Sequence, residues 1–166
     1  MRYVLIVVGI LLVAILAIVV IGWALPVKHV ATKSVQLSAS PDSVFALIST
    51  PEGYPSWRSD VKNVDVTTEN GVTRFREEGG NGPILFEITE KVPPRRFVTT
   101  IADKSLPFGG RWIYEVAPVS TGSQLTITEE GEVYNPVFRF VSRYIMGHTA
   151  TIEAYLQAVE KRLNRG

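Results

Sequence analysis

Hydrophobic residues recur with a helical period between Asn135 and Leu163, near the end of the chain. Asn135 can cap the first free amides of a helix, and Pro136 suits the first turn because proline lacks the N–H that would be unpaired there. At 3.6 residues per turn, one face carries an apolar stripe within an arc of roughly 80°. The pattern predicts one long helix that needs a wide apolar partner, such as a sheet. The stripe consists of Phe138, Val141, Ile145, His148, Ile152, Leu156, Val159 and Leu163.

Within this stretch, Gly147 is the one residue that disfavours a helix. Glycine costs about 1 kcal/mol relative to alanine in a helix interior. Its presence therefore predicts either close packing against a neighbour or a bend.

A second apolar stretch, from Tyr3 to Leu25, contains no charged residue and leaves no polar face. Its length of about 23 residues exceeds the roughly 20 that cross the hydrocarbon core of a bilayer, and Trp23 fits an interfacial aromatic residue. A cleaved signal peptide is the alternative because Gly22 and Ala24 form a small-x-small site, but the apolar run is longer than the usual core of such a peptide. We predict a retained single-pass anchor in the cell membrane. The flanking charges leave the side of the membrane open.

Directly after this anchor the hydrophobic pattern alternates with period 2, which predicts a strand over residues 29–38. Ser40 and Pro41 then provide a cap and a first-turn proline for a short helix. Pro51 ends that helix, and a second short helix or turn follows through residues 54–58.

The chain from Val61 to Val133 is a succession of six strand-length runs separated by turn signals. One of these signals is Asn70-Gly71, which supplies the positive φ angles of a tight hairpin. No helical stripe in this part is long enough for a crossover connection, so an antiparallel meander is favoured. We predict an α+β fold over residues 27–166, following an anchor over residues 1–26. A curved antiparallel sheet of about seven strands wraps around the C-terminal helix, with a cavity between them.

Composition narrows the range of functions. The 17 basic and 16 acidic residues give a net charge of +1, and the basic residues are scattered, so nucleic acid is not an expected partner. With no Cys there is no disulfide framework, no thiolate nucleophile and no zinc ribbon. The sequence contains no HExxH, GxSxG or phosphate-loop pattern. We therefore assign no catalytic residue, metal or cofactor.

Several stretches of residues 28–163 resemble the START and pollen-allergen superfamily, also called SRPBCC, and within it the polyketide cyclase/dehydrase and lipid transport proteins. They are PDSVFALIST, YPSWRSDVKNVDV, ITEKVPPRRFVTTI, FGGRWIYEVAP, GSQLTITEEGEV and GHTATIEAYLQAVEKRL. These are packing and turn features, and none is a catalytic signature. The resemblance implies the helix-grip fold and a cavity for a hydrophobic ligand. The N-terminal span lies outside the common domain, as in a membrane-anchored variant.

Candidate ligand-binding residues are those that the predicted helix and strands turn toward the cavity. His148 could contact a ligand or move a proton, although a lone histidine on an apolar face is more often a core residue. Phe108, in a Pro- and Gly-rich loop, is the candidate gate, and Arg76 could bind the polar head of an amphiphile. The full set is Val141, Ile145, His148, Ile152, Phe86, Trp112, Tyr114, Phe108 and Arg76.

Three classes of function fit these features. The first is a membrane-anchored protein that binds a lipid or another hydrophobic small molecule between sheet and helix. The second is an enzyme similar to polyketide cyclases or aromatases, which would use the same cavity. The third is a module that binds a membrane protein and needs no cavity. No exposed motif in the sequence identifies such a protein partner.

Overall fold

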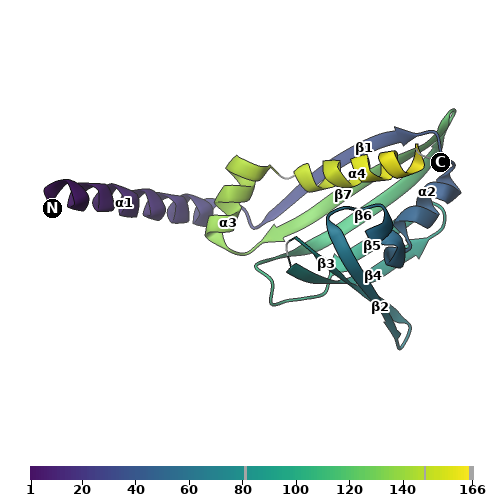
Figure 1. Cartoon of the computed structure of the whole chain (residues 1–166), viewed down its shortest axis with the longest axis horizontal. Helices are drawn as coiled ribbons and strands as arrows, with labels where there is room; N and C mark the ends of the chain where they lie inside the picture. Colours follow the sequence, from purple (N-terminus) through teal and green to yellow (C-terminus); the bar gives the residue numbers. More distant parts are fainter. Residues whose placement is uncertain (81, 148, 165–166) are drawn as a thin grey trace.

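A computed structural model describes residues 1–80, 82–147 and 149–164 (Figure 1). The chain begins with helix α1 (Arg2–Ala24) and continues into the first strand and two short helices, β1 (Lys28–Leu37), α2 (Pro41–Ile48) and the 3-10 helix η1 (Pro51–Ser56). Six strands follow, β2 (Val61–Glu69), β3 (Val72–Gly79), β4 (Gly82–Val92), β5 (Arg96–Ile101), β6 (Phe108–Val119) and β7 (Gly122–Val133). The C-terminal part consists of α3 (Pro136–Val141), the π-helical turn η2 (Ser142–Met146) and α4 (Ala150–Leu163).

The seven strands form one antiparallel sheet in the order β1-β7-β6-β5-β4-β3-β2. Its curvature leaves an inner face on which α4, α2 and η1 lie (Figure 1). The main core joins this face to α4, where Ile152 and Val159 pack on strand residues such as Leu125 and Ile127, all without exposed surface. The α+β class and the helix-grip arrangement predicted from the sequence are confirmed.

Local signals place the turns and helix starts as expected. The side chain of Asn135 accepts hydrogen bonds from the amides of Val137 (2.9 Å) and Phe138 (3.2 Å), and Ser40 caps α2 in the same manner. Asn70 and Gly71 both have positive φ angles, of 50° and 79°, between β2 and β3. This left-handed geometry is what a two-residue hairpin requires.

The predicted single helix over residues 135–163 is divided into two parts. Gly147 adopts φ 74° and ψ 158°, a conformation that ends the first helical part. An added Cβ at Gly147 would meet no atom within 4 Å, so this glycine marks a bend and not close packing. As a result, Ile152 is fully buried whereas Phe138 and Ile145 are 52% and 71% exposed. The apolar stripe is continuous in sequence but only its second half faces the sheet.

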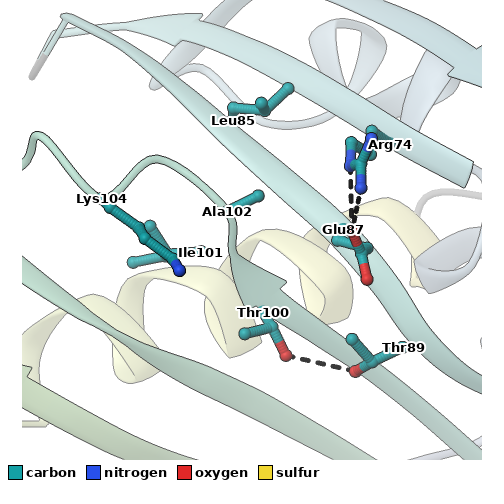
Figure 2. A pocket seen from close by; sticks show the side chains of 8 residues that line it. All are labelled: Arg74, Leu85, Glu87, Thr89, Thr100, Ile101, Ala102 and Lys104. Atoms are coloured by element: carbon teal, nitrogen blue, oxygen red, sulfur yellow. Dashed lines mark hydrogen bonds and ion pairs between the residues drawn. The ribbon is translucent and has the colours of Figure 1, made fainter.

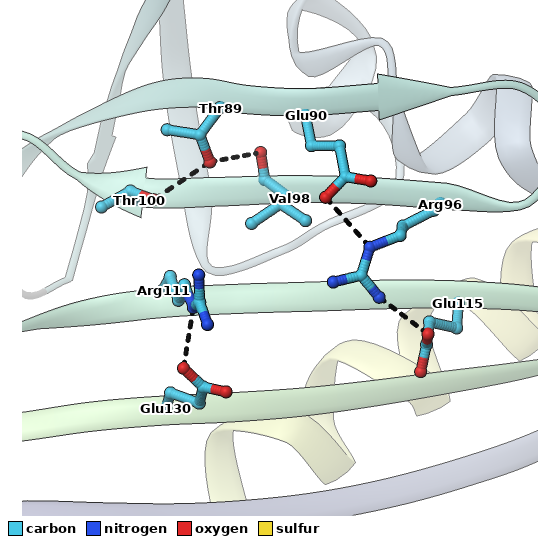
Figure 3. A network of polar contacts seen from close by, with 8 residues as sticks. All are labelled: Thr89, Glu90, Arg96, Val98, Thr100, Arg111, Glu115 and Glu130. Carbon is cyan, nitrogen blue, oxygen red and sulfur yellow. Dashed lines mark hydrogen bonds and ion pairs between the residues drawn. The ribbon is translucent and has the colours of Figure 1, made fainter.

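The outer face of the sheet is polar and carries cross-strand ion pairs (Figure 3). Arg96 pairs with Glu90 (3.0 Å) and Glu115 (2.7 Å), and Arg111 pairs with Glu130 (2.7 Å). Beneath these side chains, Val98 and Ile113 are buried. The long polar side chains therefore cover the apolar residues that alternate to this side.

Helix α1 is the one helix among the described residues that is long and apolar enough to cross a membrane, and its apolar window is not buried against the rest of the chain. Only Leu25, Pro26 and Val27 separate it from β1. The amide of Val133, at the end of β7, donates to the carbonyl oxygen of Val27 at 2.9 Å. The start of β1 and the end of β7 therefore both lie directly beside the end of α1.

Candidate functional site

The inner face of the sheet is covered unevenly, because α4 begins only at Ala150. At the end that α4 and α2 cover, Tyr114 and Val116 are buried. Toward the end where α1 joins, Phe86 and Trp112 are only half-buried although they point to the same face. The candidate site lies at the boundary between these two parts.

Aromatic rings from η1, from the residue after it and from β6 meet around Tyr155 of α4. Its ring centroid lies 6.4 Å from that of Tyr54 in η1 and 5.4 Å from that of Trp57, the residue directly after η1. From β6, Trp112 and Tyr114 approach Tyr155 at 5.7 and 5.5 Å. Edge-to-face and tilted pairs of this kind stabilise a core beyond the area they bury. We call these five residues the aromatic cluster.

A buried ion pair lies against the aromatic cluster. The guanidinium of Arg58 donates to Glu77 at 2.8 Å and to Asp60 at 2.6 Å. The side chains of Arg58 and Glu77 are only 12% and 13% exposed, while that of Asp60 is 66% exposed. Arg58 also lies 5.2 Å from the ring centres of both Tyr54 and Tyr155, which is within cation–π range. Arg58 therefore joins the carboxylates to the rings.

Burial governs the protonation of these groups. Burial raises the pKa of the Glu77 carboxyl, and the charge of Arg58 limits that rise. Burial disfavours the charged form of Arg58, but the hydrogen bond to Asp60 and the charge of Glu77 outweigh it and raise the pKa of the guanidinium. Burial also raises the pKa of Tyr54, Tyr114 and Tyr155, so these phenols remain neutral at physiological pH.

Two donors of the cluster are buried without a hydrogen-bond partner, the indole Nε1 of Trp57 and the hydroxyl of Tyr155. The neighbouring phenol Tyr54 donates its own proton to the carbonyl oxygen of Ile48 at 2.6 Å, and its contact with the Tyr155 hydroxyl falls short of hydrogen-bond geometry. Leaving such a group unpaired costs about 1–3 kcal/mol. Neither donor therefore has its hydrogen-bonding capacity met within the described residues.

The structure brings together some of the residues predicted from the sequence. Ile152 and Tyr114 belong to the main core and Trp112 packs against it, and both Trp112 and Tyr114 are members of the aromatic cluster. Phe86 stacks on Phe75 with ring centroids 5.1 Å apart, on the same face. Phe108 is half-buried at the start of β6, where it pairs with Val133. Their assignment to a ligand site stays a prediction.

Other predicted residues lie elsewhere. Val141 and Ile145 belong to α3 and η2, which lie beyond the bend at Gly147, and Ile145 faces solvent. Arg76 is exposed on the outer face because strand alternation gives the inner position to its neighbour Phe75. His148 lies outside the described residues.

Sequence reasoning did not single out Arg58, Trp57 and Tyr155 as site residues. Tyr155 is three residues after Ile152, so it borders the predicted helical stripe. Glu77 shares a strand face with Phe75, and a carboxylate buried at that position needs a partner. The partner, Arg58, comes from a loop 19 residues earlier, and its position depends on the fold of η1.

Two surface pockets lie among the described residues, and neither of them lies between the sheet and α4. Figure 2 shows the first, of about 360 Å³, on the outer side of β3, β4 and β5, where Arg74 donates to Glu87 at 2.7 and 2.9 Å. The second, of about 450 Å³, lies between α2, η1 and the end of α4. The predicted cavity under the helix therefore stays a prediction. Among residues 1–80, 82–147 and 149–164, no group of three or more His, Cys, Asp or Glu could hold a metal.

Several solved structures share this fold. A START superfamily protein from Mycobacterium smegmatis superposes with a TM-score of 0.67 at 17% identity, over 82% of this chain and 98% of that one. The Zhui aromatase/cyclase from Streptomyces sp. R1128 gives 0.66 at 12% identity, over 83% and 94% of the two chains. Norcoclaurine synthase from Thalictrum flavum gives 0.66 at 15% identity, over 84% and 88%. At these identities the likeness establishes the fold alone.

Among curated proteins, none matches the sequence significantly. The model of one protein family, described as polyketide cyclase / dehydrase and lipid transport, matches residues 28–164. The match covers all seven strands of the sheet, the two short helices α2 and η1, and α4. A fold of this kind suggests binding of a hydrophobic ligand. The chain belongs to the polyketide cyclase / dehydrase and lipid transport family.

Proposed function

We propose that this chain is a membrane-anchored binding protein for a lipid or another hydrophobic small molecule that carries a polar group. The ligand lies on the half-buried part of the inner face, next to α4, and α1 holds the domain at the membrane. The observation that carries this proposal is the pair of buried, unpartnered donors, Trp57 Nε1 and the Tyr155 hydroxyl, beside apolar rings.

The chemistry of the site supports an amphiphilic ligand. Phe86, Ile88 and Trp112 offer half-buried apolar surface, whose removal from water contributes about 25 cal/mol per Å². A polar atom of the ligand that accepts from Tyr155 or Trp57 would remove the cost of an unpaired buried donor. The Arg58–Glu77 pair is already satisfied, so it holds the rings in place and leaves little net charge for the ligand.

Photo-crosslinking of the full chain tests this proposal. The chain is reconstituted in lipid nanodiscs that contain a small fraction of a diazirine fatty acid, is irradiated, and the crosslinked peptides are mapped by mass spectrometry. Crosslinks to α1 report lipid contact of the anchor and serve as the internal reference. We expect additional crosslinks to the inner-face segments of β4, β6 and α4.

The variant Tyr155→Phe removes the unpaired hydroxyl and keeps the ring. We expect it to lower the inner-face crosslinks relative to α1 by about 5–13-fold, because a hydrogen bond contributes about 1–1.5 kcal/mol. Tyr134→Phe is the matched control, since the exposed Tyr134 hydroxyl bonds only to Glu132 (2.8 Å). Crosslinks confined to α1, α3 and η2 would contradict the proposal. So would an unchanged yield of inner-face crosslinks in Tyr155→Phe.

A further inference from the structure

Exposed apolar side chains gather on α3, which packs beside the end of α1, and on η2, which continues α3. Phe138, Tyr144 and Ile145 are 52%, 60% and 71% exposed, and the rings of Phe140 and Tyr144 pack with centroids 5.0 Å apart. Exposed apolar residues that occur singly are ordinary, but a contiguous group marks an interaction surface. We call residues 135–145 the juxtamembrane segment.

The juxtamembrane segment is fixed to the end of α1 by backbone contacts. A Cβ atom on Gly22 would collide with the carbonyl group of Pro136, so only glycine permits this approach. Arg139 donates to the carbonyl oxygens of Leu25 (2.7 Å) and Trp23 (3.4 Å). The last carbonyls of a helix have no partner within the helix, so Arg139 caps α1 from the side.

The apolar surface of the juxtamembrane segment is continuous with that of α1. Trp23 is 76% exposed in the last turn of α1, next to the carbonyl groups that Arg139 binds. Aromatic residues and arginines near the end of a membrane-spanning helix are typical of the interface between hydrocarbon and lipid head groups. The segment carries both kinds, with Phe138 and Tyr144 beside Arg139 and Arg143.

We propose that the juxtamembrane segment lies in the lipid interface of the bilayer leaflet beside which α1 ends, with Phe138, Tyr144 and Ile145 in contact with lipid. This inference rests on the anchoring by α1 that forms part of the proposed function. The bend at Gly147 then separates a lipid-facing helical part from the sheet-facing helix α4. The domain is held at the membrane by two elements, and α4 begins at the membrane side of the grip.

The absence of cysteine from the sequence permits a direct test with single labels. Phe138→Cys and Ile145→Cys are labelled with a polarity-sensitive fluorophore in the full chain and reconstituted in phosphatidylcholine and phosphatidylglycerol liposomes. Two quenchers are compared, aqueous iodide and a lipid nitroxide placed just below the head groups. We expect both labels to be quenched by the nitroxide and to be at least threefold less sensitive to iodide than a water-exposed label.

Two further labels make the outcome unambiguous. Val92→Cys provides the water-exposed reference, since Val92 is 43% exposed at the end of β4, and the register through Arg96 and Glu115 places it away from the start of β6 and from α1. Leu12→Cys, in the middle of α1, reports whether the anchor is in the bilayer.

The inference is overturned if iodide quenches the labels at positions 138 and 145 as strongly as the label at position 92, while the label at position 12 is protected from iodide. In that outcome the anchoring still holds. If the label at 12 is itself accessible to iodide, the anchoring fails and this inference fails with it. Ligand binding on the inner face is measured separately, by the crosslinks to β4 and β6.

Discussion

Helix α4 and the segment that precedes it share one apolar period but have different surroundings. Ile152 in α4 has no exposed surface, whereas Ile145, seven residues earlier and so two helical turns away, is 71% exposed. The sheet covers the first, and nothing among the described residues covers the second. A helical apolar stripe therefore shows that an apolar neighbour is needed and does not specify which neighbour it is.

The sheet-facing helix is additionally held by the buried ion pair. Arg58 stacks against Tyr155 and pairs with Glu77, so it ties α4 to β3 through the loop after η1. The juxtamembrane segment has a different arginine, Arg139, which binds backbone carbonyls of α1. Each half of the helical stretch is therefore fixed by one arginine to a different part of the chain.

Replacing Arg58 should produce the largest loss of stability. Arg58→Met leaves the Glu77 carboxylate buried without a cation, which costs about 3–5 kcal/mol in the free energy of unfolding. Urea unfolding of the full chain in detergent, followed by near-ultraviolet circular dichroism of the aromatic cluster, measures this loss. Arg111→Met is the control, because Arg111 pairs with Glu130 on the exposed outer face, where little change is expected.

The loss in Arg58→Met should depend on pH with a defined sign. Burial raises the pKa of Glu77, so the folded chain binds this proton more readily than the unfolded chain. The destabilisation is therefore greatest above the raised pKa, shrinks as the pH falls through it, and is smallest near the ordinary pKa of Glu. The double variant Arg58→Met/Glu77→Gln should lose this pH dependence. A loss that is equal at all pH values would contradict the role assigned to the carboxylate.

Truncating the two isoleucines compares the two environments directly. Ile152→Ala should lower the free energy of unfolding by about 2–5 kcal/mol, because it opens a cavity in the core. Ile145→Ala should change it by less than about 0.5 kcal/mol, since the side chain is exposed within the chain. The same unfolding experiment in detergent measures both. Equal losses would mean that the juxtamembrane segment packs on the sheet after all.

At the bend we expect a smaller loss of stability than in Arg58→Met or Ile152→Ala. Gly147 has φ 74° and ψ 158°, a region that only glycine adopts readily, so Gly147→Ala should cost about 1–3 kcal/mol. Gly53→Ala is the matched control, because its Cβ would also meet nothing within 4 Å and its φ is not positive. If Gly147→Ala instead stabilises the chain and raises the helical circular dichroism signal, residues 135–163 form one helix, as the periodicity alone predicts.

Most of the fold could be predicted from the sequence because its signals are local. Alternation identified the strands, the Asn70-Gly71 pair located a hairpin, and Ser40 and Asn135 marked helix starts. The break at Gly147 was flagged as a bend or a packing position, but local pattern could not choose between them. That choice depends on whether the sheet extends far enough to cover both halves of the stripe.

Less of the candidate site could be predicted, because it depends on contacts between distant segments. The pattern identified Trp112, Tyr114 and Ile152 through their faces on a strand and a helix. Arg58 and Trp57 lie in an irregular loop without a period, so nothing local predicts that Arg58 reaches Glu77. Arg76 was predicted to bind the polar head of an amphiphile, and the structure places it on the outer side, where it is exposed.

The three-residue connection between α1 and β1 limits how far the domain can travel. Three extended residues span at most about 11 Å, and the bond from Val133 to Val27 closes even this short connection onto the sheet. With α1 in a bilayer, the grip cannot shuttle cargo to another membrane. Under the proposed anchoring, the grip exchanges any membrane-derived molecule only with the bilayer that holds α1.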